Sequence, residues 1–268
     1  MKYSIYQVDA FASELFKGNP AAVCPLAHWL DDQMMQNIAS ENNLAETAFI
    51  VKRDDGYDIR WFTPTVEVDL CGHATLASAF IVFSFLEKSS KHVSFYSSRS
   101  GELTVDLLED TLVLNFPIDS IEKIPLDLQY YSGLNIAPKE VYKGKSDYML
   151  IYDNEEQILN LKPDFAKLSQ IEARGVIVTS VGKEVDFVSR YFGPQSGGDE
   201  DAVTGSAHTS MVPYWARVLN KNTFRAKQLS TRGGDLYCTL NGDRVSISGK
   251  CILYMKGEIY LSRVHSLG

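Results

Sequence analysis

The amino-acid sequence predicts an α+β fold built from two similar halves. Short segments rich in Val, Ile, Tyr and Phe dominate the chain, and this composition is typical of β-strands. Two longer segments, 72–87 and 205–219, are rich in small and apolar residues and are predicted to be central helices. Each segment begins at a glycine that follows a stretch containing polar residues, and the two glycines are separated by about half of the 268-residue chain. This offset indicates an internal structural repeat.

The composition indicates a compact protein with a large core. Hydrophobic residues make up 45% of the chain and charged residues 22%, which argues against disorder and fibrous repeats. The net charge is −8, so no basic stripe is available to bind nucleic acid. The longest uncharged apolar stretch, 74–86, is too short to span a bilayer, and Asp9 interrupts the apolar run needed for a signal peptide. We expect a cytoplasmic protein with no nucleic-acid or membrane partner.

Many of the predicted strands alternate with turns and are expected to pair as antiparallel hairpins. The turns at 109–110 and 241–243 each separate two alternating apolar runs, and the second contains an Asn-Gly pair. In chain order the predicted strands are 2–11, 46–52, 58–62, 93–96, 103–108, 112–116, 140–142, 148–152, 175–179, 186–192, 236–240, 244–248 and 252–261.

Helices are fewer, and besides the two central ones they are predicted at 31–41, 121–131 and 163–170. Strand patterning is interrupted at 115–121, where Pro117 precedes a polar pair. We therefore divide the chain into an N-terminal half-domain, 1–118, and a C-terminal half-domain, 119–268. We expect that the last strand can cross back to the first half.

The two helix starts are candidate receptors for a carboxylate. A glycine at the start of a helix leaves backbone N–H groups exposed at the positive end of the helix dipole. If Gly72 and Gly205 face each other, their helix starts form a cleft that can bind an anion. The alternative is that both glycines only allow close packing or cap their helices.

Two side chains near the first helix start are candidates for proton transfer. Glu46 lies in an apolar stretch, where desolvation favours the protonated form of a carboxyl group. His73 lies in the first turn of its helix, where the dipole and burial are expected to lower the imidazole pKa and keep the ring neutral. The alternatives are a Glu46 that points to water and a His73 that is only a buried structural residue. At the second helix start, 199–201 are acidic, and His208 is a weaker candidate.

The cysteines argue against a disulfide framework and a zinc site. The four cysteines are far apart and form no C-x-x-C pair. A two-thiol proton-transfer enzyme would need a cysteine at both helix starts, but Cys71 stands at the first and Thr204 at the second. We therefore interpret Cys71 as a packing residue. The pair Gly233-Gly234 lacks the spacing of a dinucleotide- or phosphate-binding loop.

Several motifs together resemble the phenazine-biosynthesis PhzF-like isomerases, which share the diaminopimelate epimerase fold. The resemblance covers nearly the whole chain and rests on Y-Q-V-D-A-F (6–11), G-N-P-A-A-V (18–23), E-N-N-L-A-E-T-A-F (41–49), F-T-P (62–64), E-V-D-L-C-G-H-A-T (67–75) and E-D-A-V-T-G-S-A-H (200–208). One departure is Ala202, where the family usually has proline.

The resemblance implies that each half is a mainly antiparallel sheet rolled around its central helix, with the active site between the halves. It implies that Glu46 is the acid/base glutamate, and that His73 and Asp201 orient and polarise the substrate. Gly72, Gly205 and Ser206 would then anchor the substrate. The family prototype isomerises a dihydro-hydroxyanthranilate without cofactor or metal, and family members commonly form homodimers.

We therefore expect a cofactor-independent isomerase that moves a proton on a small carboxylate. The alternatives are an amino-acid racemase or epimerase that uses thiols, and a ligand-binding protein of the same fold without catalysis. The identity of the substrate cannot be predicted from the sequence, because one fold serves many small acids.

Overall fold

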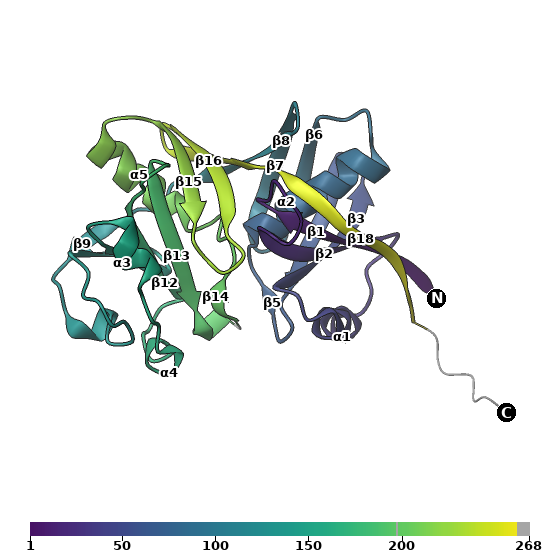
Figure 1. Ribbon diagram of the computed structural model, residues 1–268. Coiled ribbons are helices and arrows are strands. Elements are labelled where there is room, and N and C mark those ends of the chain that lie inside the picture. Colours follow the sequence, from purple (N-terminus) through teal and green to yellow (C-terminus); the bar gives the residue numbers. More distant parts are fainter. Residues whose placement is uncertain (197, 262–268) are drawn as a thin grey trace.

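The computed structural model describes residues 1–196 and 198–261, which form two lobes side by side (Figure 1). The lobe on the right in Figure 1 contains most of the first half of the chain, and the lobe on the left contains most of the second half. The last strand, β18, runs across the right lobe. No helix in the described part is long and apolar enough to cross a membrane.

The first lobe contains a mixed sheet in which β18 (Cys251–Tyr260) pairs with the N-terminal strand β1 (Lys2–Ala10). From β1 the sheet continues through β2, β3, β4, β6, β7 and β8, and the pairs β2–β3 and β4–β6 are parallel. The bounds are β2 Asn19–Leu26, β3 Glu46–Arg53, β4 Gly56–Phe62, β5 Glu67–Val68, β6 His92–Ser97, β7 Gly101–Leu108 and β8 Thr111–Pro117. Helix α1 spans Asp32–Asn42, and helix α2, Gly72–Ile81, continues into a π-helix over Val82–Leu86.

The second lobe contains a sheet in the order β9, β10, β11, β12, β13, β15, β16 and β17, with β14 beside β13. The pairs β11–β12 and β13–β15 are parallel and the others antiparallel. The bounds are β9 Glu122–Ile124, β10 Glu140–Lys143, β11 Asp147–Ile151, β12 Gly175–Val181, β13 Phe187–Gly193, β14 Gly198–Asp201, β15 Thr223–Gln228, β16 Gly234–Asn241 and β17 Arg244–Gly249. The helices are α3 Glu155–Leu159, α4 Phe165–Leu168 and α5 His208–Leu219, with short 3-10 turns at Leu128–Tyr130 and Pro194–Ser196.

Two strands connect the lobes. Strand β8 pairs with β7 of the first lobe on one side and with β17 of the second lobe on the other. Strand β18 follows β17 in sequence and returns to the first lobe, where it pairs with β1. The strands therefore form one continuous hydrogen-bonded series, and the division of the chain at residue 118 stays a prediction.

The central helices are held by burial on the sheets. Helix α2 contacts β1, β2, β3 and β8, and its Leu76, Ala77 and Ile81 have no exposed surface. Helix α5 contacts β16 and β17, and its Trp215 stacks on Phe187 with ring centroids 5.8 Å apart. Pro213 within α5 has no N–H to donate to the carbonyl of Thr209, and the N–H of Asp119 donates to that carbonyl instead (3.2 Å).

The predicted mixture of a mainly antiparallel sheet and few helices is confirmed, but several elements differ. The predicted helix at 121–131 is wrong: Pro125 favours extended backbone before it, and 122–124 form β9 with a 3-10 turn further on. The second central helix begins at His208 rather than Gly205. The N–H groups of residues 208–210 donate to the carbonyl oxygens of residues 205–207, three positions earlier. The segment before the helix is therefore a turn of the 3-10 type, which is tighter than an α-helix. Strand β2 was missed because its two prolines argue against a central strand.

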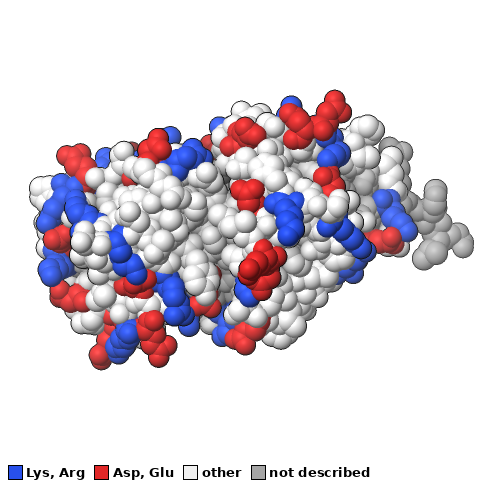
Figure 2. Space-filling model, turned by 90° about the horizontal axis from the view of Figure 1, so that it is seen from above, with Lys and Arg blue, Asp and Glu red and all other residues white. Residues whose placement is uncertain are grey.

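On the face shown in Figure 2, basic and acidic side chains are interspersed, without a continuous basic stripe.

Candidate active site between the two lobes

The start of α2 and the turn that leads into α5 meet between the lobes. A Cβ atom added to Gly72 would lie 3.8 Å from the Cα of Gly205, and one added to Gly205 would lie 3.9 Å from the Cα of Gly72. The ring of Phe116 lies against Gly72, and the ring of Phe11 lies against Gly205. The two segments that the sequence pairs as helix starts are therefore neighbours in space.

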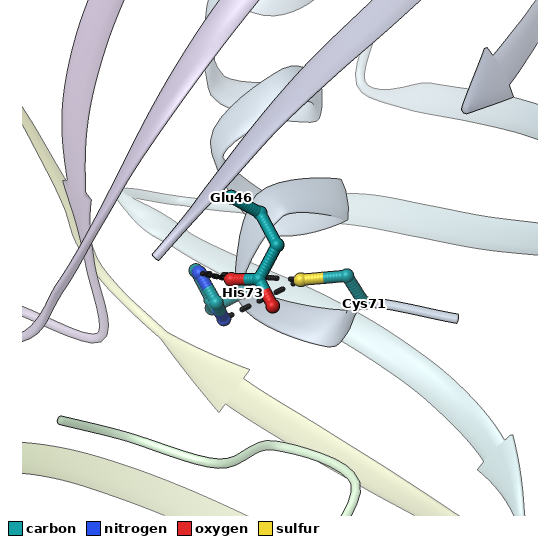
Figure 3. A group of neighbouring side chains, drawn as sticks. All are labelled: Glu46, Cys71 and His73. Carbon is teal, nitrogen blue, oxygen red and sulfur yellow. Dashed lines mark hydrogen bonds and ion pairs between the residues drawn. The ribbon is translucent and has the colours of Figure 1, made fainter. Parts of the chain in front are cut away.

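Glu46 and His73 meet at this place (Figure 3). Glu46 is the first residue of β3, and His73 is the second residue of α2. The Glu46 Oε2 atom lies 2.9 Å from His73 Nε2, and the Glu46 side chain is only 18% exposed. This oxygen is buried, and the short contact with His73 is an ion pair without the alignment of a hydrogen bond. Glu46 therefore does not point into bulk water.

The expected protonation of His73 is wrong. Burial alone would lower the pKa of this imidazole, but the adjacent Cys71 and the carboxylate of Glu46 act in the opposite direction. Together they outweigh burial and raise the pKa of His73 well above its usual value of 6.5. The helix dipole and burial alone do not account for these two neighbours: the fold brings Glu46 to the ring, and Cys71 lies two residues before His73 in the chain.

Asp201 reaches the same place from the second lobe. It is the last residue of β14, and its Oδ1 accepts a hydrogen bond from Asn19 Nδ2 at 2.7 Å. Its Oδ2 accepts a hydrogen bond from the hydroxyl of Thr204 at 2.5 Å. Burial raises the pKa of Asp201, as does the nearby Glu46, although His73 acts against them. Asp201 is therefore linked to the first lobe through Asn19.

Asn19 is the site residue that sequence reasoning missed. It is fully buried at the start of β2, and its Nδ2 also lies 2.9 Å from the carbonyl oxygen of Val203 and 3.1 Å from His73 Nδ1. Strands β2 and β3 are parallel neighbours, so Asn19 and Glu46 lie at the same end of the sheet. The available signal was its place in the motif G-N-P (18–20), which gave no chemical role by itself.

The second helix start keeps its backbone donors available. The N–H of Thr204 donates to Gln228 Oε1 at 2.8 Å, whereas no described group accepts a hydrogen bond from the N–H of Gly205 or Ser206. Ser206 is partly buried, and its carbonyl accepts from the N–H and hydroxyl of Thr209. In α2 the N–H groups of the first turn likewise have no acceptor within the helix. The N–H group of Gly205 and those of the first turn of α2 therefore lie near each other, because Gly72 and Gly205 are neighbours.

The three acidic residues 199–201 lie in three different environments. Asp201 is at the site, Asp199 is exposed, and Glu200 forms a two-pronged ion pair with Arg190 at 2.7 and 2.9 Å. Of these acidic residues, Asp199 is therefore solvated, whereas Glu200 is paired. The pair holds β14 against β13 and so positions Asp201.

His208 serves the fold around the second start. It is fully buried, its Nδ1 lies 3.0 Å from the carbonyl oxygen of Thr204, and its ring lies near Phe187. Burial lowers the pKa of His208 to about 4, so the ring is neutral and donates from Nδ1. The structure does not place it with Glu46 and His73.

Glu46, Cys71 and His73 also bring three donor atoms within 4.8 Å of one another, so a metal ion must be considered. A metal on His73 Nε2 would leave a proton on Nδ1, where metal sites usually supply a carboxylate or carbonyl acceptor. Here Nδ1 faces the amide nitrogen of Asn19, which is a donor, and the Cys71 sulfur, which would itself be used by the metal. The surroundings therefore do not fit a metal centre.

Comparisons with known proteins identify the family of this chain. The family described as phenazine biosynthesis-like protein (PhzC-PhzF) matches residues 8–257. An uncharacterized isomerase of Pseudomonas aeruginosa is 51% identical, over 97% of this chain and 100% of that protein. The crystal structure of a PhzF-family phenazine biosynthesis protein from Enterococcus faecalis has a TM-score of 0.93 at 47% identity, covering 97% of this chain and 100% of that one.

A more distant likeness concerns the fold alone. A hydroxyproline epimerase from Agrobacterium vitis, with bound trans-4-hydroxy-L-proline, has a TM-score of 0.64 at 10% identity, over 98% of this chain and 94% of that one. With these likenesses the expected α+β fold of the diaminopimelate epimerase type is confirmed. Because a family model matches most of its length and a relative covering it is more than half identical, the chain belongs to the phenazine biosynthesis-like (PhzC-PhzF) protein family.

Proposed function

We propose that this isomerase moves a proton on a small carboxylate-bearing metabolite, with Glu46 as the proton carrier and without a cofactor. The observation that carries the proposal is the 2.9 Å contact between Glu46 Oε2 and His73 Nε2, buried where the two helix starts meet. A carboxylate held out of water beside an anion receptor has the arrangement that proton abstraction next to a bound acid requires.

In the proposed reaction the Glu46 carboxylate removes a proton from a carbon of the substrate. The C–H electron pair moves into the adjacent unsaturated or carboxyl group, and Glu46 returns the proton to another position. No electrons are gained or lost overall, so the reaction needs no oxidant or reductant. General acid/base catalysis of this kind contributes roughly 10²- to 10⁴-fold to a rate.

The neighbouring groups match the needs of such a reaction. The imidazolium of His73 keeps a positive charge beside Glu46, and Asp201, with its raised pKa, can hold a proton for donation to the substrate. The N–H groups at Gly72, Gly205 and Ser206 would bind the substrate carboxylate, assisted by the helix dipoles. The negative charge that develops in the transition state would thus meet donors that are already in place.

The test measures exchange of solvent hydrogen. A panel of cyclic and amino carboxylates is first screened by thermal shift, because a ligand that binds only the folded protein raises its melting temperature. The best ligand is then incubated with the protein in deuterium oxide. Deuterium should enter its carbon skeleton with the wild type and with Glu41→Gln, an exposed control in α1, but not with Glu46→Gln. Full exchange by Glu46→Gln would refute the role of Glu46.

The alternatives give different results in this test. A thiol racemase needs a second thiol, but Thr204 occupies that position and donates its hydroxyl to Asp201. Burial, followed by the charge of Glu46, raises the pKa of Cys71 to about 11, which disfavours a thiolate. Exchange that requires Cys71 rather than Glu46 would favour the racemase. Tight binding without any exchange would indicate a receptor.

We extend the proposal to the class of substrate, the oligomeric state and the cellular compartment. We expect a cytoplasmic homodimer that acts on a small carboxylate. Size-exclusion chromatography with light scattering checks the dimer, since a mass of 30.0 kDa in solution would mean a monomer. The chemistry proposed for Glu46 uses residues of one chain and does not depend on the dimer.

A further inference from the structure

Gln228, the last residue of β15, is fully buried beside the segment that carries Asp201. Its Oε1 atom accepts a hydrogen bond from the N–H of Thr204 at 2.8 Å, and its Nε2 atom donates to the carbonyl oxygen of Asp201 at 2.9 Å. A backbone N–H can only donate, and a carbonyl oxygen can only accept. These two backbone partners therefore leave a single orientation for the amide of Gln228.

The orientation of this amide decides the direction of the next hydrogen bond. The second hydrogen of Gln228 Nε2 has the hydroxyl oxygen of Thr204 as its acceptor, at 3.3 Å. Because Nε2 can only donate, the hydroxyl accepts on this side, and its own hydrogen donates to Asp201 Oδ2 at 2.5 Å. A chain of hydrogen bonds thus runs from Gln228 through Thr204 to the carboxylate of Asp201.

The opposite direction would leave a hydroxyl hydrogen unpaired. If Asp201 carried a proton on Oδ2 and donated it to Thr204, the hydroxyl oxygen would accept from both Asp201 and Gln228. Its own hydrogen would then have no acceptor among the described residues. Thr204 is only 8% exposed, and a buried polar group without a partner costs free energy. The surroundings of Thr204 therefore favour donation to Asp201.

Both oxygens of Asp201 accept hydrogen bonds, because Asn19 Nδ2 donates to Oδ1 at 2.7 Å. Hydrogen bonds to both oxygens favour the charged form of a carboxyl group. Burial acts against them and raises the pKa of Asp201, while the charge of His73 lowers it and the charge of Glu46 raises it. Tyr191, opposite Asp201 on β13, is a further titratable neighbour. The protonation of Asp201 thus depends on a balance in which the donated hydrogen bonds take part.

We propose that Gln228 is a positioning residue that acts on Asp201 through Thr204. Its amide fixes the hydroxyl of Thr204 as a donor to the carboxylate, and its bond to the carbonyl oxygen of Asp201 holds the same residue in place. The hydrogen bond from Thr204 lowers the pKa of Asp201, so without it the effect of burial would be larger. Gln228 thereby sets part of the pH range over which Asp201 holds a proton. Only the catalytic consequence of this inference rests on the proposed function.

The experiment is ¹³C NMR of the aspartate carboxyl groups in the full-length protein, with Asp201→Asn used to assign the Asp201 signal. In Thr204→Val the titration midpoint of Asp201 should rise by roughly one pH unit, because a hydrogen bond to a charged group is lost. Thr204→Ser keeps the hydroxyl and should leave the midpoint close to the wild-type value. Gln228→Met, which keeps a long unbranched side chain, should raise the midpoint by part of the shift seen in Thr204→Val.

A double variant separates an effect through Thr204 from a general loss of packing. In the Thr204→Val background Gln228→Met should add little to the shift of Asp201, because the hydroxyl through which it acts is already gone. Gln36→Met is the matched control, since it removes another side-chain amide that donates to a loop carbonyl, that of Thr63, and it should leave the midpoint unchanged.

Three results would overturn the inference. The first is a Thr204→Val midpoint equal to that of the wild type, and the second is a Gln228→Met midpoint equal to that of Gln36→Met. The third is a shift from Gln228→Met that is as large in the Thr204→Val background as in the wild type. The two Thr204 variants test the donated hydrogen bond even if Gln228→Met does not fold. None of these measurements uses turnover, so they stand apart from the test of Glu46.

Discussion

The carboxylate of Glu46 and the imidazole of His73 lie 2.9 Å apart, although they come from different elements, the start of β3 and the first turn of α2. The contact is buried, and it lies where Gly72 of the first lobe meets Gly205 of the second. The proposed base, its partner His73 and the proposed anion receptor thus share one place.

The receptor can be blocked without harming the fold. In Gly72→Ala the new Cβ would lie 3.6 Å from Phe116 and 3.8 Å from Gly205, which is ordinary van der Waals contact. We expect the free energy of unfolding to change by less than about 1 kcal/mol. Binding of the carboxylate ligand should weaken at least tenfold, because the methyl group occupies the space between the helix starts. Urea denaturation and isothermal titration calorimetry measure the two effects.

Gly198→Ala is the matched control for this variant, since a Cβ there meets no atom of the described residues within 4 Å. It should leave both stability and binding unchanged. If Gly72→Ala binds the ligand as well as the Gly198→Ala control does, the helix starts are not the receptor.

The charge of His73 should make its contribution to stability depend on pH. Because its folded pKa is raised above the unfolded value of 6.5, the contribution is fully present below pH 6.5 and is lost as the pH rises through the folded pKa. Wild type should therefore exceed His73→Gln in stability most at pH 5 to 6, and the difference should shrink in alkaline solution. Urea denaturation of both proteins across pH 5 to 10 gives this curve. A difference that grows with pH would mean that the folded pKa is lowered.

An ion pair between the lobes supports the loop that leads to Asn19. Asp9 is only 2% exposed, and its Oδ1 lies 2.7 Å from Nη2 of Arg232. The Nε of the same arginine donates to the carbonyl oxygen of Gly18. Arg232→Ala leaves a buried carboxylate without its cation and should cost about 3 kcal/mol. Chemical denaturation checks this value.

Adding Asp9→Asn to Arg232→Ala should restore much of the lost stability, because the second change removes the uncompensated charge. Arg244→Ala, which removes an exposed arginine bonded to Asn115, is the control and should cost less than about 1 kcal/mol. If Arg232→Ala costs no more than Arg244→Ala, the pair contributes nothing to this interface.

The elements that the sequence predicted best are those with a strong local signal. The strands around β7, β8, β16 and β17 follow from alternating apolar residues, and α1 follows from Asp31, whose side chain accepts from the N–H of Met34. Strand β2 could not be recognised, because its position between β1 and β3 is decided by long-range pairing in spite of two prolines.

The sequence likewise predicted the site residues that carry a local signal and missed those defined by distant contacts. Glu46, His73 and Asp201 stand out as polar residues in distinctive motifs, and the structure brings them to one place. Asn19 is defined only by partners in two distant segments, and the protonation of His73 depends on Glu46, which the fold brings to the ring, as well as on the nearby Cys71. Such relationships exist only in three dimensions, so composition and spacing do not reveal them.

The central claim is that one carboxylate, Glu46, carries the proton. The most direct measurement is a single turnover, in ordinary water, of substrate deuterated at the reacting carbon. The account predicts that part of the deuterium appears at the new position in the product, and that Glu46→Gln slows this transfer by about 10²- to 10⁴-fold. Transfer at the wild-type rate in Glu46→Gln would contradict the account.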